Sequence, residues 1–151
     1  MNKKGFLLAE ETLKIIIALI AIGLLAYLLA SLYFSSKTSS ELEQAKASLP
    51  FILNATIDGK ASIDVYNPKS WWISYWPRTI KGSDSQIPKL CTNLGLQSCI
   101  CICKKDTSDQ CDSSGVCGDN LGFLIQGGSI QIKDPPITLD INKDDKVISK
   151  K

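Results

Sequence analysis

Hydrophobic residues are distributed very unevenly along the chain. Residues 15–34 read IIIALIAIGLLAYLLASLYF and include no charged residue. As a helix this segment is about 30 Å long, at about 1.5 Å per residue, which matches the hydrocarbon core of a bilayer. A protein of 151 residues has no interior that could surround such a segment on all sides. The pattern therefore predicts a single transmembrane helix, which we assign to residues 6–34.

The charges around this helix indicate its orientation. Three lysines precede the uncharged stretch at residues 15–34, whereas two lysines that follow it are balanced by two glutamates. Because lysine and arginine are in excess on the cytoplasmic side of a membrane, the N-terminus is predicted to be cytoplasmic and the C-terminal part extracellular. The apolar core exceeds the about 7 to 15 residues of a cleavable secretory signal, so we expect the helix to be retained. The external triplet Asn-Ala-Thr makes Asn54 a candidate glycosylation site.

Residues 35–60 are predicted to form a stalk. Leu42, Ala45 and Leu49 recur at helical spacing within a polar, serine-rich stretch, which indicates that the helix projects beyond the bilayer. Proline has no backbone N–H, so Pro50 is expected to end or kink this helix. The alternative is a flexible linker.

Beyond residue 60 the hydrophobic period changes to two, which is typical of strands. Gly127-Gly128 predicts a hairpin turn and Pro135-Pro136 a break. The fold class is therefore predicted to be α+β: an N-terminal transmembrane helix with a helical stalk, followed by a small antiparallel β-rich domain over residues 61–151. The strands that we expect cover residues 61–66, 71–76, 122–126, 129–133, 137–141 and 147–148.

The aromatic run at residues 71–76 allows two interpretations. A strand places Trp72 and Trp76 on one face, and Trp71, Ile73 and Tyr75 on the other. A central strand with both faces in the core accounts for this pattern, because aromatic side chains dominate small cores. The alternative is that Trp72 and Trp76 form a surface platform for a glycan, a partner subunit or lipid headgroups.

Six cysteines in a small external domain predict disulfide bonds. If the segment SCICICK at residues 98–104 is a strand, its three cysteines point from one face at intervals of about 6.7 Å. That spacing is too long for a bridge between neighbours, whose β-carbons must lie about 3.8 Å apart. Cys99, Cys101 and Cys103 are therefore each expected to pair with one of Cys91, Cys111 and Cys117. Several pairings satisfy this condition, and we favour Cys91–Cys99, Cys101–Cys117 and Cys103–Cys111.

Other chemistry receives little support. The C-x-C-x-C spacing lacks the two-residue spacers typical of thiolate metal or iron–sulfur sites, so neither a metal nor a cofactor is expected. The acidic run at residues 140–145 lacks the glycine and glutamate of a calcium loop and predicts a polar hairpin tip. The chain has no histidine, which removes the commonest general base. Its net charge is only +2, and its lysines and arginine form no basic cluster that would bind nucleic acid. We therefore expect neither an enzyme nor a nucleic-acid partner.

The start of the chain reads Lys3-Lys4-Gly5-Phe6-Leu7-Leu8-Ala9-Glu10. This segment resembles the leader of type IV prepilins and related archaeal surface proteins, and the resemblance ends with the transmembrane helix. It implies that residues 1–5 are a leader, cut between Gly5 and Phe6 by a prepilin peptidase. It also implies that Glu10 pairs with the new amino group of Phe6 in a neighbouring subunit.

The doubled acid Glu10-Glu11 departs from the commoner bacterial sequence Phe-Thr-Leu-Ile-Glu, and this departure favours an archaeal source. The alternative is that both acids merely complement the helix dipole. The function that we expect is a membrane-anchored surface protein, either a type IV pilin-like subunit that assembles with copies of itself or with related subunits, or a pilin-related protein. The second hypothesis is a tethered binding module that does not polymerise and that holds a glycan, peptide or partner protein.

Overall fold

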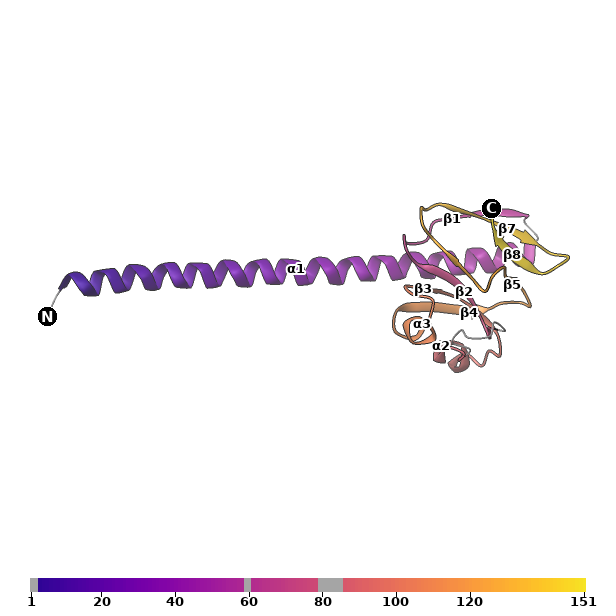
Figure 1. The fold of residues 1–151 in the computed structure, drawn as a ribbon, viewed down its shortest axis with the longest axis horizontal. Helices are drawn as coiled ribbons and strands as arrows, with labels where there is room; N and C mark the ends of the chain where they lie inside the picture. Colours follow the sequence, from indigo (N-terminus) through magenta and orange to yellow (C-terminus); the bar gives the residue numbers. More distant parts are fainter. Residues whose placement is uncertain (1–2, 59–60, 79–85) are drawn as a thin grey trace. The chain divides into compact units, whose positions relative to one another are not determined.

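The computed structural model describes residues 3–58, 61–78 and 86–151, with side chains from residue 11 onward (Figure 1). The chain divides into two compact units, Met1–Ser39 and Ser40–Lys151, and we call the second unit the head. Helix α1 (Lys3–Asp58) contributes residues to both units.

The first unit consists of an apolar helix. Its large apolar side chains between Leu13 and Phe34 are 53–71% exposed, and none of the residues in its most apolar stretch is buried. Among the described residues, α1 is the one helix that is long and apolar enough to cross a membrane. An apolar surface on every side is what a segment surrounded by lipid requires.

The part of α1 within the head is amphipathic. Its buried side chains, which recur every three or four residues, are Ala45, Leu49, Ile52 and Ala55, with Leu42 partly buried beside them. The expectation that Pro50 ends the helix is wrong, because α1 continues to Asp58. Pro50 lies on the exposed face, where water can satisfy the carbonyl that loses its helical partner, while the buried stripe holds the helix in place.

The remaining chain forms two four-stranded sheets, which confirms the predicted α+β class. Every strand pair is antiparallel except β5 with β8. Sheet A has the order β1 (Ser62–Val65), β7 (Ile137–Asn142), β8 (Val147–Lys150) and β5 (Leu124–Ile125). Sheet B has the order β4 (Gly115–Asp119), β3 (Cys99–Cys103), β2 (Trp72–Trp76) and β6 (Ser129–Gln131).

Within the head, α1 packs between the two sheets (Figure 1). One core cluster joins its buried stripe to Ile63 and Leu139 of sheet A and to Ile73 and Ile100 of sheet B. The described part of the stalk that was assigned to residues 35–60 is therefore helical, and its residues from Ser40 to Asp58 belong to the head.

A glycine in sheet B allows the helix to approach the sheet closely. A β-carbon at Gly118 would lie 2.9 Å from Leu53 Cδ1 and 3.4 Å from Leu49 Cδ2. The first distance is shorter than carbon atoms tolerate, so a larger residue at this position would require the Leu53 side chain to shift.

Several elements differ from the sequence-based expectations. Gly127 and Gly128 do not join a hairpin, because β5 pairs with β8 in sheet A, whereas β6 pairs with β2 in sheet B. Both glycines adopt positive φ values, and together they carry the chain from one sheet to the other. Strand β4 and the short helices α2 (Lys89–Asn93) and α3 (Ser108–Ser114) were not expected, since their sequences are polar and show no clear period.

Candidate functional site

The aromatic strand β2 lies inside sheet B and has two buried faces. Trp71, just before the strand, and Ile73 and Tyr75 within it face the core that contains α1. Trp76 has no exposed surface and packs among the cysteines. The alternative of an exposed aromatic platform is therefore wrong for Trp76, because α2 and the bridges cover it, whereas Trp72 is only partly buried.

The cysteines form a second core on the other face of sheet B. Because β3 is a strand, Cys99, Cys101 and Cys103 share one face, while Ile100 and Ile102 face the helix. The disulfides join Cys91 to Cys99, Cys101 to Cys117 and Cys103 to Cys111, and no cysteine is free. These are the pairings that the sequence analysis favours.

Each bridge ties β3 to a different neighbouring element. Cys91 lies in α2 and Cys111 in α3, and Cys117 lies directly opposite Cys101 in the adjacent strand β4. The bridges therefore attach two short helices that have little apolar surface of their own.

The bridges also lie close to one another. Cys101 Sγ is 3.5 Å from Cys91 Sγ and 3.8 Å from Cys99 Sγ. Four of the sulfurs lie within 4.8 Å of one another, a spacing at which reduced thiolates could hold a metal ion. In the bridged state none of these sulfurs is a thiolate, the form that binds a metal ion, so the cluster acts as a cross-linked core.

A polar cluster lies beside this core and centres on Asp106. Its carboxylate accepts hydrogen bonds from Ser74 Oγ at 2.5 Å and from Ser129 Oγ at 2.8 Å, and it forms an ion pair with Arg78. The Arg78 guanidinium lies 4.2 Å from the ring centroid of Trp76. The loop after β3 is thereby attached to β2 and β6, and each charge has a partner, as burial requires.

The residues implied by the prepilin resemblance lie in the first turns of α1. The backbone of residues 3–10 is helical. The structure describes side chains only from residue 11 onward. The processing role of Gly5 and Phe6 and the assembly role of Glu10 therefore stay predictions.

The sequon residue Asn54 is exposed on the head part of α1, but Thr56 is only 3% exposed. The Thr56 hydroxyl donates a hydrogen bond to the Leu53 carbonyl at 2.7 Å. A transferase that needs this hydroxyl in an open conformation would have to act before the head folds. Glycosylation at Asn54 stays a prediction.

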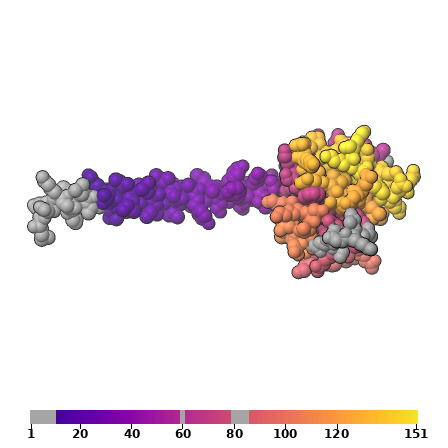
Figure 2. All heavy atoms as spheres, in the orientation of Figure 1, coloured from indigo at the N-terminus to yellow at the C-terminus, as the bar shows by residue number. Residues whose placement is uncertain are grey.

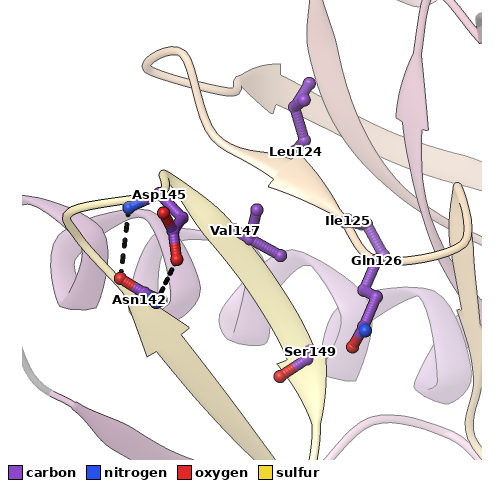
Figure 3. A pocket seen from close by; sticks show the side chains of 7 residues that line it. All are labelled: Leu124, Ile125, Gln126, Asn142, Asp145, Val147 and Ser149. Carbon is purple, nitrogen blue, oxygen red and sulfur yellow. Dashed lines mark hydrogen bonds between the residues drawn. The ribbon is translucent and has the colours of Figure 1, made fainter.

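The acidic run forms the tip of the β7–β8 hairpin, as expected. Asn142 Oδ1 accepts hydrogen bonds from the backbone N–H groups of Asp144 and Asp145, and Asn142 Nδ2 donates to the Asp145 carboxylate at 2.7 Å. A surface hollow of about 520 Å³ lies beside this turn, between Leu124, Gln126 and Ser149 (Figure 3). The acidic group that lines it is already engaged in the turn, and we assign no ligand to it.

The large apolar side chains between Leu13 and Phe34 form the surface of the first unit. Figure 2 draws the atoms of this segment in indigo to purple. Comparison of the chain with protein-family models, with curated proteins and with solved structures finds no match. The evidence on function therefore comes from the residues and their arrangement.

Proposed function

We propose that this protein is a type IV pilin-like surface subunit, anchored in the cell membrane by its N-terminal helix and displaying its head outside the cell. The observation that carries the proposal is the dual character of α1. Its first part is apolar on every side, and its last part supplies the central stripe of the head core. A long N-terminal helix whose outer half packs under a globular head resembles the plan of pilins.

The external location of the head is supported by its cysteines. All six are paired, and five of them have no exposed surface. Disulfides persist in oxidising surroundings and are rare in the cytosol. The lysines that precede the apolar helix favour the same orientation.

The proposal assigns display and assembly to this chain, and no catalytic step. The sequence contains no histidine, and every cysteine is committed to a bridge. The commonest general base and the thiolate nucleophile are therefore both missing from the folded head.

Processing is the first test. When the full chain is produced together with a prepilin peptidase, we expect intact-mass measurement to show the loss of residues 1–5. Replacement Gly5→Leu should block the cut, because the new side chain alters the residue just before the cleaved bond. An uncut monomer that stays in the membrane in both cases would reject the subunit role and favour the tethered binding module.

Assembly is the second test, and the doubled acid provides a matched control. Glu10→Ala should leave membrane insertion intact and abolish filaments seen by electron microscopy, because the amino group of Phe6 loses its partner. Glu11→Ala removes the same charge from the adjacent position and should leave filaments intact. Equal effects of the two variants would favour a helix-dipole role for both acids.

A further inference from the structure

Strands β1 and β5 end sheet A, and strands β4 and β6 end sheet B. Strand β1 lies at one end of sheet A, and β6 lies at one end of sheet B. Beside β6 is a groove that is also lined by Gln126 and Gly127, which directly follow β5 at the other end of sheet A. The β6 groove therefore reaches the end of sheet A that β5 forms, whereas β1 forms the other end of that sheet.

The hydrogen bonds of β1 show which backbone groups its outer edge presents. Ile141 N–H donates to the Ala61 carbonyl, so odd-numbered residues of β1 bond to β7. The backbone groups of Ser62 and Asp64 consequently point outward. Within the described residues, they have no backbone partner.

The same reasoning applies to β6. Tyr75 N–H donates to the Gly128 carbonyl and Ile132 N–H donates to the Trp71 carbonyl, so even-numbered residues of β6 bond to β2. Ser129 and Gln131 therefore present their backbone groups outward. Each edge can accept one further extended segment.

Each edge lies beside a groove, and the charges that line the two grooves have opposite sign. The β1 groove has a volume of about 380 Å³, apolar walls from Phe51, Val65 and Tyr66, and Asp64 as its charged residue. The β6 groove has a volume of about 420 Å³ and is lined by Lys133 and Lys150.

These charges are available to a partner. The carboxylate next to Lys133 belongs to Asp134, which is engaged by Lys69 at 3.0 Å. Asp64 accepts one hydrogen bond, from the Thr138 hydroxyl at 2.7 Å, through one of its two oxygens. Both lysines and Asp64 are exposed.

We propose that the β6 edge of one head docks into the β1 groove of a second copy of this chain, with Lys133 and Lys150 facing Asp64. The two surfaces are different patches near different ends of sheet A, so one copy can present both and the contact can be repeated from copy to copy. Such a heterologous contact generates an open filament when its rotation does not close a ring. The inference rests on the proposed subunit function and adds the head surfaces through which neighbouring subunits recognise each other.

The test is a charge exchange in the full chain, processed in cells as above. Asp64→Lys alone, and the pair Lys133→Glu with Lys150→Glu alone, should each reduce the number of filaments about tenfold, because like charges then face each other. All three replacements together should restore filaments to within about threefold of the unmodified chain. Peptide mapping of the three bridges checks that each variant has folded.

The matched controls change the same charges elsewhere on the exposed surface. They are Asp144→Lys at the hairpin tip, and Lys104→Glu with Lys105→Glu after β3, and both should assemble normally. Normal assembly of the single exchanges, or failure of the combined exchange to restore filaments, would overturn the docking proposal while leaving the subunit function intact. If filaments return only when a different protein is present, the β1 groove binds that protein and not a second copy of this chain, which would also overturn the docking proposal. An unmodified chain that never assembles would overturn both proposals.

Discussion

The two faces of sheet B are stabilised in different ways. On one face, Ile73, Ile100 and Ile102 pack against α1 and sheet A in an apolar core. On the other face, Trp76 and six cysteines form a core with three covalent cross-links. The first face is covered by a long amphipathic helix, whereas the helices that the described residues place over the second face are α2 and α3, with five and seven residues.

The difference follows from how much apolar surface each covering element contributes. Isolated helices of that length are not stable in water, and small cores commonly need cross-links. The bridges thus replace the apolar packing that α2 and α3 cannot supply. If this is correct, the two cores should respond differently to reduction and to truncation of side chains.

Reduction of the three bridges should have the largest effect. Their sequence separations are 8, 16 and 8 residues, for which loop-closure entropy gives about 3 kcal/mol per bridge. The sum is comparable to the whole stability of a small domain, about 5 to 15 kcal/mol. Hydrogen exchange in the presence of a thiol reductant should show α2, α3 and β4 losing protection before sheet A. Simultaneous loss throughout the head would contradict a division into two cores.

Truncation of Trp76 should have the next largest effect. Because this side chain is fully buried, Trp76→Ala should lower the free energy of unfolding by about 3 to 5 kcal/mol. Trp72→Ala is the control on the same strand. Because the Trp72 side chain is only partly buried, its removal should lower the free energy of unfolding by about 1 kcal/mol. Denaturant titration of the micelle-bound chain, followed by circular dichroism, measures both. Similar small losses would show that Trp76 contributes little to the cysteine core.

Truncation of Ile52 tests the apolar core. Ile52 has no exposed surface, so Ile52→Ala should lower the free energy of unfolding by about 2 to 4 kcal/mol. Its neighbour Phe51 is 46% exposed, so Phe51→Ala should lower it by about 1 kcal/mol or less. The same titration applies. A larger loss from Phe51→Ala than from Ile52→Ala would contradict the assignment of the apolar core to the buried stripe of α1.

Replacement of Pro50 should have the smallest effect, and in the opposite direction. Alanine restores a backbone N–H inside α1 and removes the penalty of an interior proline. Since proline also restricts the unfolded chain, the net gain from Pro50→Ala should be about 1 kcal/mol, or a few degrees in Tm. A lower Tm would show that the proline itself shapes the helix against the two sheets.

The strands show which parts of the fold can be predicted from the local pattern of hydrophobic and polar residues. Alternation of Ile137, Leu139 and Ile141 with polar residues predicted β7, whereas β3 was considered only as a condition for the cysteine pairing. The two glycines at residues 127 and 128 misled the analysis, because they fit a hairpin as well as a crossing between sheets. Only the pairing of β5 and β6 with distant strands distinguishes these two conformations.

The candidate sites show the same limit. Strand geometry indicated that the three cysteines of β3 must find partners elsewhere, and the observed bridges satisfy that condition. Nothing in the sequence brings Asp106 to Ser74 and Ser129, which are 32 and 23 residues away along the chain. The two docking grooves likewise depend on which strands end the sheets.

Local patterns in the sequence predicted the apolar helix, its amphipathic continuation, the α+β class and the two apolar faces of β2. Each of these follows from local periodicity, since the period of 3.6 or 2 is a property of consecutive residues. The tertiary structure decided that the helix runs through Pro50, that the strands divide into two sheets around it, and that Trp76 is buried among the cysteines. These features depend on packing between segments distant in the chain, which local periodicity does not encode.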